Sequence, residues 1–97
     1  MVTNEEIAAI FTGIAGMLKL KKESIFKIRA YEKVARSILE LKEPVENMVK
    51  ENRIKEIPGA GEAITKKIAE LVNTGRLEFY EKLKLESKAG FPARGQL

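Results

Sequence analysis

A chain of 97 residues is long enough for one small domain with a single core, and 44% apolar and 33% charged residues are typical of a globular protein. The chain has no cysteine and no histidine, which excludes disulfides, thiolate or imidazole metal sites, and Ser-His or Cys-His catalysis. All 14 acidic residues are glutamates, so we expect no polymerase active site built on paired aspartates and Mg²⁺ in this chain.

The charge pattern restricts the partners and the location of the protein. A net charge of +4 favours a polyanionic partner but does not establish one. No apolar run approaches the length of a membrane span, and Glu5 and Glu6 stand where a secretory signal carries basic residues. We therefore expect no membrane partner and a cytoplasmic location.

The apolar spacing predicts an all-α fold, a compact domain of four to five helices. Thr3 and Glu6 form a capping box at the start of the first helix, Pro44 ends the second, and Gly75 is typical of a helix C-terminus. The expected helices cover residues 3–20, 25–41, 45–52 and 62–73, with a last short helix around 77–83. Residues 87–97 have no apolar period, so we expect a domain at 1–86 and a flexible tail after it.

A glycine turn precedes the fourth helix. Pro58 stops any helix that arrives from the N-terminal side, and Gly59 and Gly61 permit backbone conformations closed to other residues. A glycine turn that opens a helix leaves N–H groups free at the positive end of the helix dipole, where phosphates bind. A Pro-Gly turn between two helices is also often purely structural, and the turn alone does not decide between these interpretations.

Two lysines of the fourth helix occupy different faces. At about 100° per residue, Lys66 falls nearly opposite the apolar stripe and reads as a surface charge or a phosphate contact. Lys67 falls at the border of the buried face. It is either a lysine whose stem covers the core edge or a Schiff-base nucleophile, since partial desolvation near other cations favours a free amine. On the second helix, Lys27 lies one turn before Tyr31, on the same side.

Three stretches carry a resemblance to a known family. Ile57–Ile68, with the short helix before it, matches the helix-hairpin-helix motif at about 45–74. Phe26–Ala35 looks like the second-helix signature, and Thr74–Leu77 like the exit from the fourth helix, of one particular domain. Together, residues 4–85 resemble the N-terminal domain of family X DNA polymerases, the small lyase-type domain of the polymerase β kind.

The resemblance implies sequence-nonspecific binding of gapped, nicked or 5′-phosphorylated DNA in base excision repair, with a polymerase domain joined to this one in the native protein. Main-chain oxygens of Lys55, Ile57 and Ala60 would hold Na⁺ or K⁺, and no other cofactor is required. The DNA-binding residues are expected to be Lys27, Gly59, Ala60, Gly61, Glu62 and Lys66.

The resemblance also implies a reaction. The lysine at the position of Lys67 attacks the C1′ aldehyde of a 5′-deoxyribose phosphate, and the imine permits β-elimination without metal or histidine. Lys27 matches the 5′-phosphate ligand, and Tyr31 matches its neighbour in the catalytic pocket. Other polar residues of the family pocket are replaced here, with Lys66 and Arg29 as candidates to restore charge; the replacements are Phe26, Ala63, Lys66 and Phe79.

Three functions therefore remain open on the sequence. The first is a lyase-type domain that removes a sugar phosphate from gapped DNA. The second is a helix-hairpin-helix anchor that positions a partner domain on DNA without chemistry. The third is a helical protein-interaction module, suggested by Phe79 and Tyr80 and a mixed charge surface.

Overall fold

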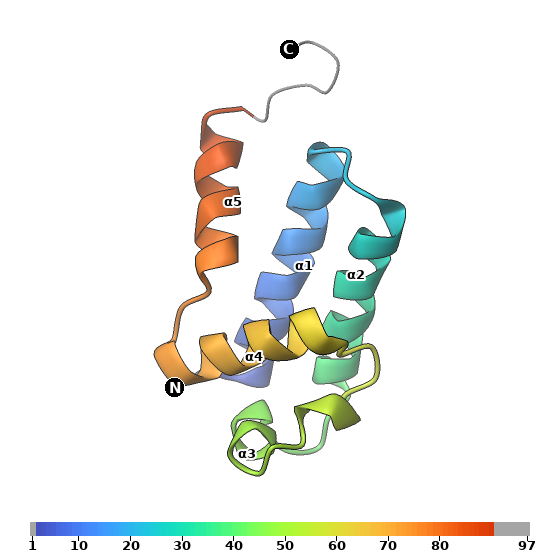
Figure 1. The fold of residues 1–97 in the computed structure, drawn as a ribbon, viewed down its shortest axis with the longest axis vertical. Helices are drawn as coiled ribbons and strands as arrows, with labels where there is room; N and C mark the ends of the chain where they lie inside the picture. Colours follow the sequence, from blue (N-terminus) through green and yellow to red (C-terminus); the bar gives the residue numbers. More distant parts are fainter. Residues whose placement is uncertain (1, 91–97) are drawn as a thin grey trace.

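The computed structural model describes residues 2–90, and every element within that range is helical (Figure 1). The all-α fold class is therefore confirmed, with five α-helices in the described residues. The elements are α1 (Asn4–Leu20), α2 (Ile25–Leu39), α3 (Val45–Lys50), the short 3-10 turn η1 (Ile54–Glu56), α4 (Glu62–Thr74) and α5 (Glu78–Lys88). None of these helices is both long and apolar enough to cross a lipid bilayer.

The predicted caps of α1 and α4 are confirmed. The Glu6 amide donates to the Thr3 hydroxyl at 3.1 Å, and the Thr3 amide donates to the Glu6 carboxylate at 3.0 Å. The hydrogen bonds from Thr3 hold the pKa of Glu6 below its usual value because they favour the charged carboxylate. At the end of α4, Gly75 has φ +78°, the left-handed conformation that glycine adopts without strain.

Three helix ends differ from the prediction by two residues or more. α2 ends at Leu39 and α3 at Lys50, each two residues early; after α2 the chain turns so that Leu41 packs against the core. α5 is longer than expected and reaches Lys88, two residues into the predicted tail. Its extra turns are stabilised by the ion pair of Glu86 with Lys21 at 3.2 Å, which no local pattern reveals. The rest of the predicted tail, residues 91–97, lies outside the described residues.

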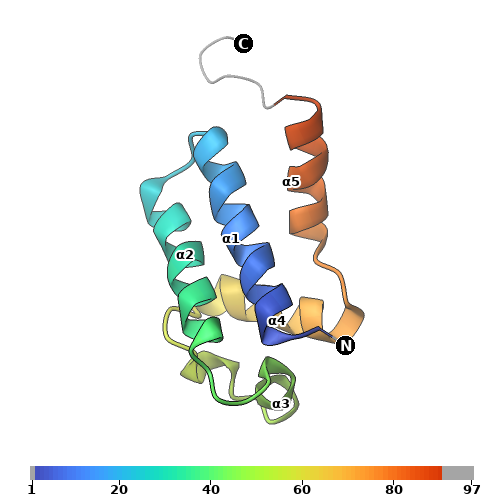
Figure 2. The ribbon, with the colours of Figure 1, turned by 180° about the vertical axis from the view of Figure 1, so that it is seen from behind.

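The helices pack around one core. α1 lies between α2 and α5, and α4 crosses these helices near one end, as the two opposite views show (Figures 1 and 2). α1, α2 and α4 all contribute fully buried side chains, which include Ile7, Phe11, Ile14, Val34, Ile38, Ile68 and Leu71. The crossing brings the first turns of α4 beside the middle of α2.

Polar contacts fix the segment between α2 and the glycine turn. The Asn4 side chain donates to the Glu43 carbonyl at 2.9 Å and accepts from the Val45 amide at 2.8 Å, which ties the start of α3 to α1. Arg53 donates twice to the Glu43 carboxylate, at 2.7 and 3.2 Å, and also binds two further glutamates, Glu51 and Glu56. These partners raise the pKa of the Arg53 guanidinium, so it stays charged. The glycine turn therefore starts from a fixed position.

Candidate DNA-binding hairpin and lysine pocket

The turn before α4 places its two glycines in different backbone conformations. Gly59 has φ +90°, which strains other residues, whereas Gly61 has φ −72°, which any residue adopts. The prediction of an unusual conformation is therefore confirmed at Gly59 and wrong at Gly61. What glycine supplies at position 61 is space, since no heavy atom lies within 4 Å of where a Cβ would stand. A ligand can approach the backbone closely there.

Free amides follow this open position. Gly61 is the N-cap of α4 and provides no side-chain cap. Within residues 2–90, the amides of Glu62, Ala63 and Ile64 donate to no acceptor, and neither does the amide of Gly59. Three successive free N–H groups at the positive end of a helix dipole form a site for one anion.

The set of donors differs from the one expected from sequence. The amides of Ala60 and Gly61 already donate within the turn, to the carbonyls of Ile57 and Gly59, both at 3.0 Å. The donors that sequence reasoning missed are the amides of Ala63 and Ile64. Placing the N-cap at Gly61 identifies them, because the amides of the first three residues after an N-cap have no acceptor within the helix, and Gly61 has no side chain that could accept from them.

Two lysines flank the turn. Lys66 is exposed and pairs with Glu62 at 3.8 Å, which confirms its predicted surface position. Lys33, on α2, packs its stem over the turn, since a Cβ at Gly59 would lie 3.2 Å from Cγ of Lys33. No carboxylate in residues 2–90 pairs with the Lys33 amine. Sequence reasoning missed Lys33, because its place beside the turn depends on how α4 crosses α2.

The carbonyls predicted to hold a monovalent cation belong to Lys55, Ile57 and Ala60. The Ile57 carbonyl accepts one hydrogen bond, from the Ala60 amide, and the Ala60 carbonyl accepts one, from the Thr65 hydroxyl at 3.3 Å. Each keeps a free lone pair, and the Lys55 carbonyl accepts no hydrogen bond within the described residues. Neutral oxygen donors suit a hard monovalent cation, so the donor set fits the predicted ion.

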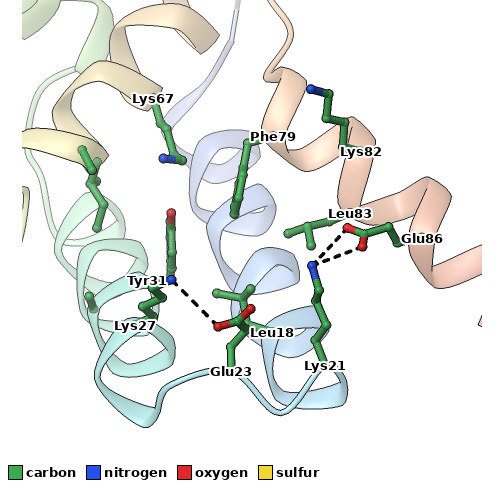
Figure 3. Close-up of a pocket in the computed structure, with 13 residues that line it drawn as sticks. Leu18, Lys21, Glu23, Lys27, Tyr31, Lys67, Phe79, Lys82, Leu83 and Glu86 are labelled. Carbon is green, nitrogen blue, oxygen red and sulfur yellow. Dashed lines mark hydrogen bonds and ion pairs between the residues drawn. The ribbon is translucent and has the colours of Figure 1, made fainter. Parts of the chain in front are cut away.

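A pocket of about 530 Å³ opens between α1, α2, α4 and α5 (Figure 3). The structure brings Lys27, Tyr31 and Lys67 together in its wall, although they come from two helices that are distant in sequence. The Lys67 amine points into the pocket on the side of the Tyr31 hydroxyl (Figure 3). The pocket therefore assembles the three residues that the resemblance assigns to the chemistry.

Aromatic rings form the floor under the Lys67 amine. The Tyr31 ring stacks between those of Phe11 and Phe79, with ring centroids 5.8 Å apart for Phe11 and Tyr31 and 6.3 Å apart for Tyr31 and Phe79. The Lys67 Nζ lies 4.8 Å from the centroid of the Phe79 ring, a cation–π contact. No carboxylate within residues 2–90 pairs with Lys67, so its amine is available to a ligand, in contrast to Lys66.

Tyr31 and Lys27 have different environments in this wall. Tyr31 is 7% exposed, and burial raises the pKa of its hydroxyl, so the phenol is protonated at neutral pH and cannot act as a base. Lys27 is exposed at the rim, with its amine 3.8 Å from the Glu23 carboxylate. That separation leaves Lys27 free to exchange Glu23 for a stronger anion such as a phosphate.

Much of the remaining wall is apolar, and its other charges are paired. Lys21 binds Glu86, while Lys82 binds Glu78 at 3.2 Å. The apolar lining includes Leu18, Ala30, Ala63, Ile64, Phe79 and Leu83. Arg29 and Phe26 are not part of this wall, and Lys66 borders only a neighbouring hollow, so neither cation restores charge inside the pocket.

Phe79 and Tyr80 do not form an exposed apolar pair. Phe79 turns into the pocket, while Tyr80 packs against α1, where a Cβ at Gly13 would lie 3.4 Å from the Tyr80 ring. Contacts within the domain therefore account for Tyr80, whereas Phe79 keeps 36% of its surface exposed at the pocket.

Comparison with known families decides the class of the domain. A family model described as a helix-hairpin-helix domain matches residues 2–77, most of the chain. The chain belongs to this helix-hairpin-helix family. The match includes Lys27, the glycine turn and Lys67 but stops before Phe79. A search of curated proteins finds no match. Helix-hairpin-helix domains bind DNA, and DNA binding is the function that the membership indicates.

Proposed function

We propose that this chain is the N-terminal, lyase-type domain of a family X DNA polymerase that acts on gapped or 5′-phosphorylated DNA in base excision repair. The observation that carries the proposal is the unpaired Lys67 amine in one pocket with Lys27 and Tyr31, next to a DNA-binding hairpin. In the native protein, a polymerase domain would follow and fill the gap that this domain recognises.

The hairpin binds the DNA backbone. The free amides of Glu62, Ala63 and Ile64 hold one phosphate of the backbone, and Gly61 lets the strand come close. Lys66 adds a nearby positive charge, since its contact with Glu62 is exposed and weak. Contacts to phosphate fix position but carry no base preference, so binding is sequence-nonspecific.

The pocket supplies the chemistry. Lys27 binds the 5′-phosphate at the rim, and the Lys67 amine attacks the C1′ aldehyde of the sugar and releases water as the imine forms. The imine acidifies the C2′ proton; its loss breaks the C3′–O3′ bond and frees the DNA strand with a 5′-phosphate. Hydrolysis of the imine releases the sugar product and restores the amine.

Borohydride trapping tests this proposal, because reduction of the imine joins the protein covalently to an incised abasic duplex. We expect the parent chain and Lys66→Ala to form the adduct and Lys67→Ala to form none. Lys66→Ala is a matched control, because it removes the same charge from the neighbouring position. A parent chain that binds the duplex but forms no adduct would contradict the lyase function.

A second candidate is a DNA anchor without chemistry, and the apolar lining of the pocket favours it. Ala63 and Phe79 stand where the family that this chain resembles has lysines, and the Lys67 amine lies over the Phe79 ring, 4.8 Å from its centroid. In that case, the parent chain binds gapped DNA but gives no covalent product. The same trapping experiment therefore separates the two candidates.

We also propose that Na⁺ or K⁺ supports the grip of the hairpin through the carbonyls of Lys55, Ile57 and Ala60. A bound cation adds positive charge beside the phosphate site. DNA affinity is then expected to be higher in potassium chloride than in choline chloride of equal ionic strength. Equal affinity in the two salts would contradict the cation site without affecting the lyase function.

A further inference from the structure

The outward face of α2 carries a row of three cations, Arg29, Lys33 and Arg36. All three are exposed, and at spacings of four and three residues they fall within a sector of about 60° around the helix axis. No carboxylate in residues 2–90 pairs with any of them. The row faces away from the pocket, and none of its members lines that wall.

Within residues 2–90, α2 carries more unpaired cations than any other helix. The helix carries four cations against a single glutamate, Glu32, which is already paired with Lys19 at 2.9 Å. Acidic and basic residues are equal in number in α3, α4 and α5. Most lysines there pair along their own helices, as Lys50 does with Glu46 at 3.3 Å, Lys82 with Glu78 at 3.2 Å and Lys84 with Glu81 at 3.4 Å. Most of the net charge of +4 is therefore concentrated on α2.

The row is continuous with the hairpin. Lys33, its middle member, packs its stem against Gly59, at the entrance to the free amides of α4. The ribbon shows the turn before α4 beside α2 (Figure 1). Arg29 and Arg36 are about 10 Å apart along the helix axis, which matches the axial rise of about three nucleotides of one strand.

We propose that the outer face of α2 is a second DNA-contact surface, on which Arg29, Lys33 and Arg36 bind successive backbone phosphates next to the one held by the hairpin. The proposal rests on the DNA binding proposed above and extends its footprint. The row itself is entirely cationic, and the exposed apolar side chains of α2 lie at the two ends of the helix, at Ile25, Phe26 and Leu39. Unpaired cations at regular spacing complement a phosphate backbone.

The test compares two triple variants of equal charge. Arg29→Gln, Lys33→Gln and Arg36→Gln are combined in one protein, and Lys50→Gln, Lys84→Gln and Lys88→Gln, which lie outside the pocket, in the other, so each has a net charge of +1 in place of +4. Glutamine is a good helix former, and all six positions are exposed, so we expect both variants to keep the melting temperature of the parent.

Affinity for a short labelled gapped duplex is measured between about 50 and 200 mM salt. For the α2 variant, we expect the slope of log affinity against log salt to fall by about 2 to 3, since each lost phosphate contact removes about one. The control is expected to keep the slope of the parent. Arg36→Gln alone is expected to lower the slope by about one.

The outcomes separate this proposal from the function on which it rests. If the parent chain does not bind the duplex, the DNA-binding function itself is contradicted. If the parent binds and Gly61→Asp weakens binding, but the α2 variant keeps the slope of the control, only the second surface is contradicted. An equal fall of the salt slope in both triple variants would mean that the effect comes from net charge and not from this face of α2. That result would also contradict the second surface.

Discussion

The hairpin and the pocket are built from different kinds of groups. In the hairpin, the proposed phosphate-binding groups are backbone amides, and their position follows from the N-cap at Gly61 and the start of α4. In the pocket, the groups are side chains that come from α1, α2, α4 and α5 and the loop between α1 and α2. The hairpin is local in sequence, and the pocket exists only once the helices have packed.

This difference explains how binding and chemistry can separate in one domain. A phosphate site made of amides survives most side-chain changes, because every residue except proline supplies an N–H. A pocket made of side chains changes with each substitution, and here Ala63 and Phe79 make its wall largely apolar while Lys67 remains. Substitutions can therefore disturb either region while leaving the other intact.

The largest expected effect is on the hairpin. Gly61→Asp places a carboxylate at the N-cap, where it accepts from the Ala63 or Ile64 amide and repels phosphate. We expect DNA affinity to fall by about 30-fold, or about 2 kcal/mol, in fluorescence anisotropy. The melting temperature is not expected to fall, because aspartate is a preferred N-cap and no heavy atom lies within 4 Å of the new Cβ.

Gly61→Asn is the control for that substitution. It fills the same space without the charge, so we expect a smaller loss of affinity. Parent-like affinity in Gly61→Asp would mean that the free amides of α4 do not hold the phosphate. It would also remove the contrast between the two regions, since neither would then carry a demonstrated DNA contact.

Gly59→Ala tests the backbone of the turn. At φ +90° an alanine is strained, and its Cβ would press on the Lys33 stem, so we expect a loss of about 1–2 kcal/mol in the free energy of unfolding by urea. Gly16→Ala, within α1 and with no atom within 4 Å, is expected to stabilise by about 0.5–1 kcal/mol. If both substitutions changed the free energy of unfolding in the same direction, the positive φ assigned to Gly59 would be contradicted.

Phe79→Lys tests whether the pocket binds a 5′-phosphate. The new amine adds a positive charge beside Lys67, so we expect the preference for 5′-phosphorylated over 5′-hydroxyl gapped DNA to rise roughly threefold, or about 0.7 kcal/mol. Phe79→Leu keeps the wall apolar and is expected to give no gain. An unchanged preference in Phe79→Lys would place the 5′-phosphate elsewhere on the domain.

The smallest expected effect is that of Tyr31→Phe on trapping. Because burial keeps the Tyr31 phenol protonated, its removal is expected to change the trapping yield by less than about twofold, or about 0.4 kcal/mol. A tenfold loss would assign the hydroxyl a direct part in the reaction.

The same variant has a second, pH-dependent readout. The pKa of Tyr31 is raised on folding, so its contribution to stability is complete below the unfolded-state pKa of about 10 and is lost as pH rises through the folded-state pKa. Urea unfolding at alkaline pH should therefore show a steeper loss of stability in the parent than in Tyr31→Phe. Identical pH profiles would contradict the effect of burial on this group.

The features predicted correctly from sequence depend on neighbours within a few residues. Helical apolar spacing is enough to place Lys66 outside and Lys67 at the border of the core, and local hydrogen bonds are enough to define the capping box of Thr3 and the left-handed Gly75. The prediction that Gly61 has a backbone conformation closed to other residues is wrong, because a Gly-x-Gly pattern does not reveal which glycine has positive φ.

Local sequence patterns are enough to predict the helices, the N-terminus of α4 and a lysine at the edge of the core. Which groups meet depends on how the helices pack. This packing places Lys33 over Gly59, stacks Tyr31 on Phe79 beneath the Lys67 amine, and leaves Arg29, Lys33 and Arg36 of α2 without a carboxylate partner in residues 2–90. Helix caps and apolar spacing depend on residues within about one or two helical turns of each other. These tertiary contacts depend instead on how helices that are distant in sequence cross one another.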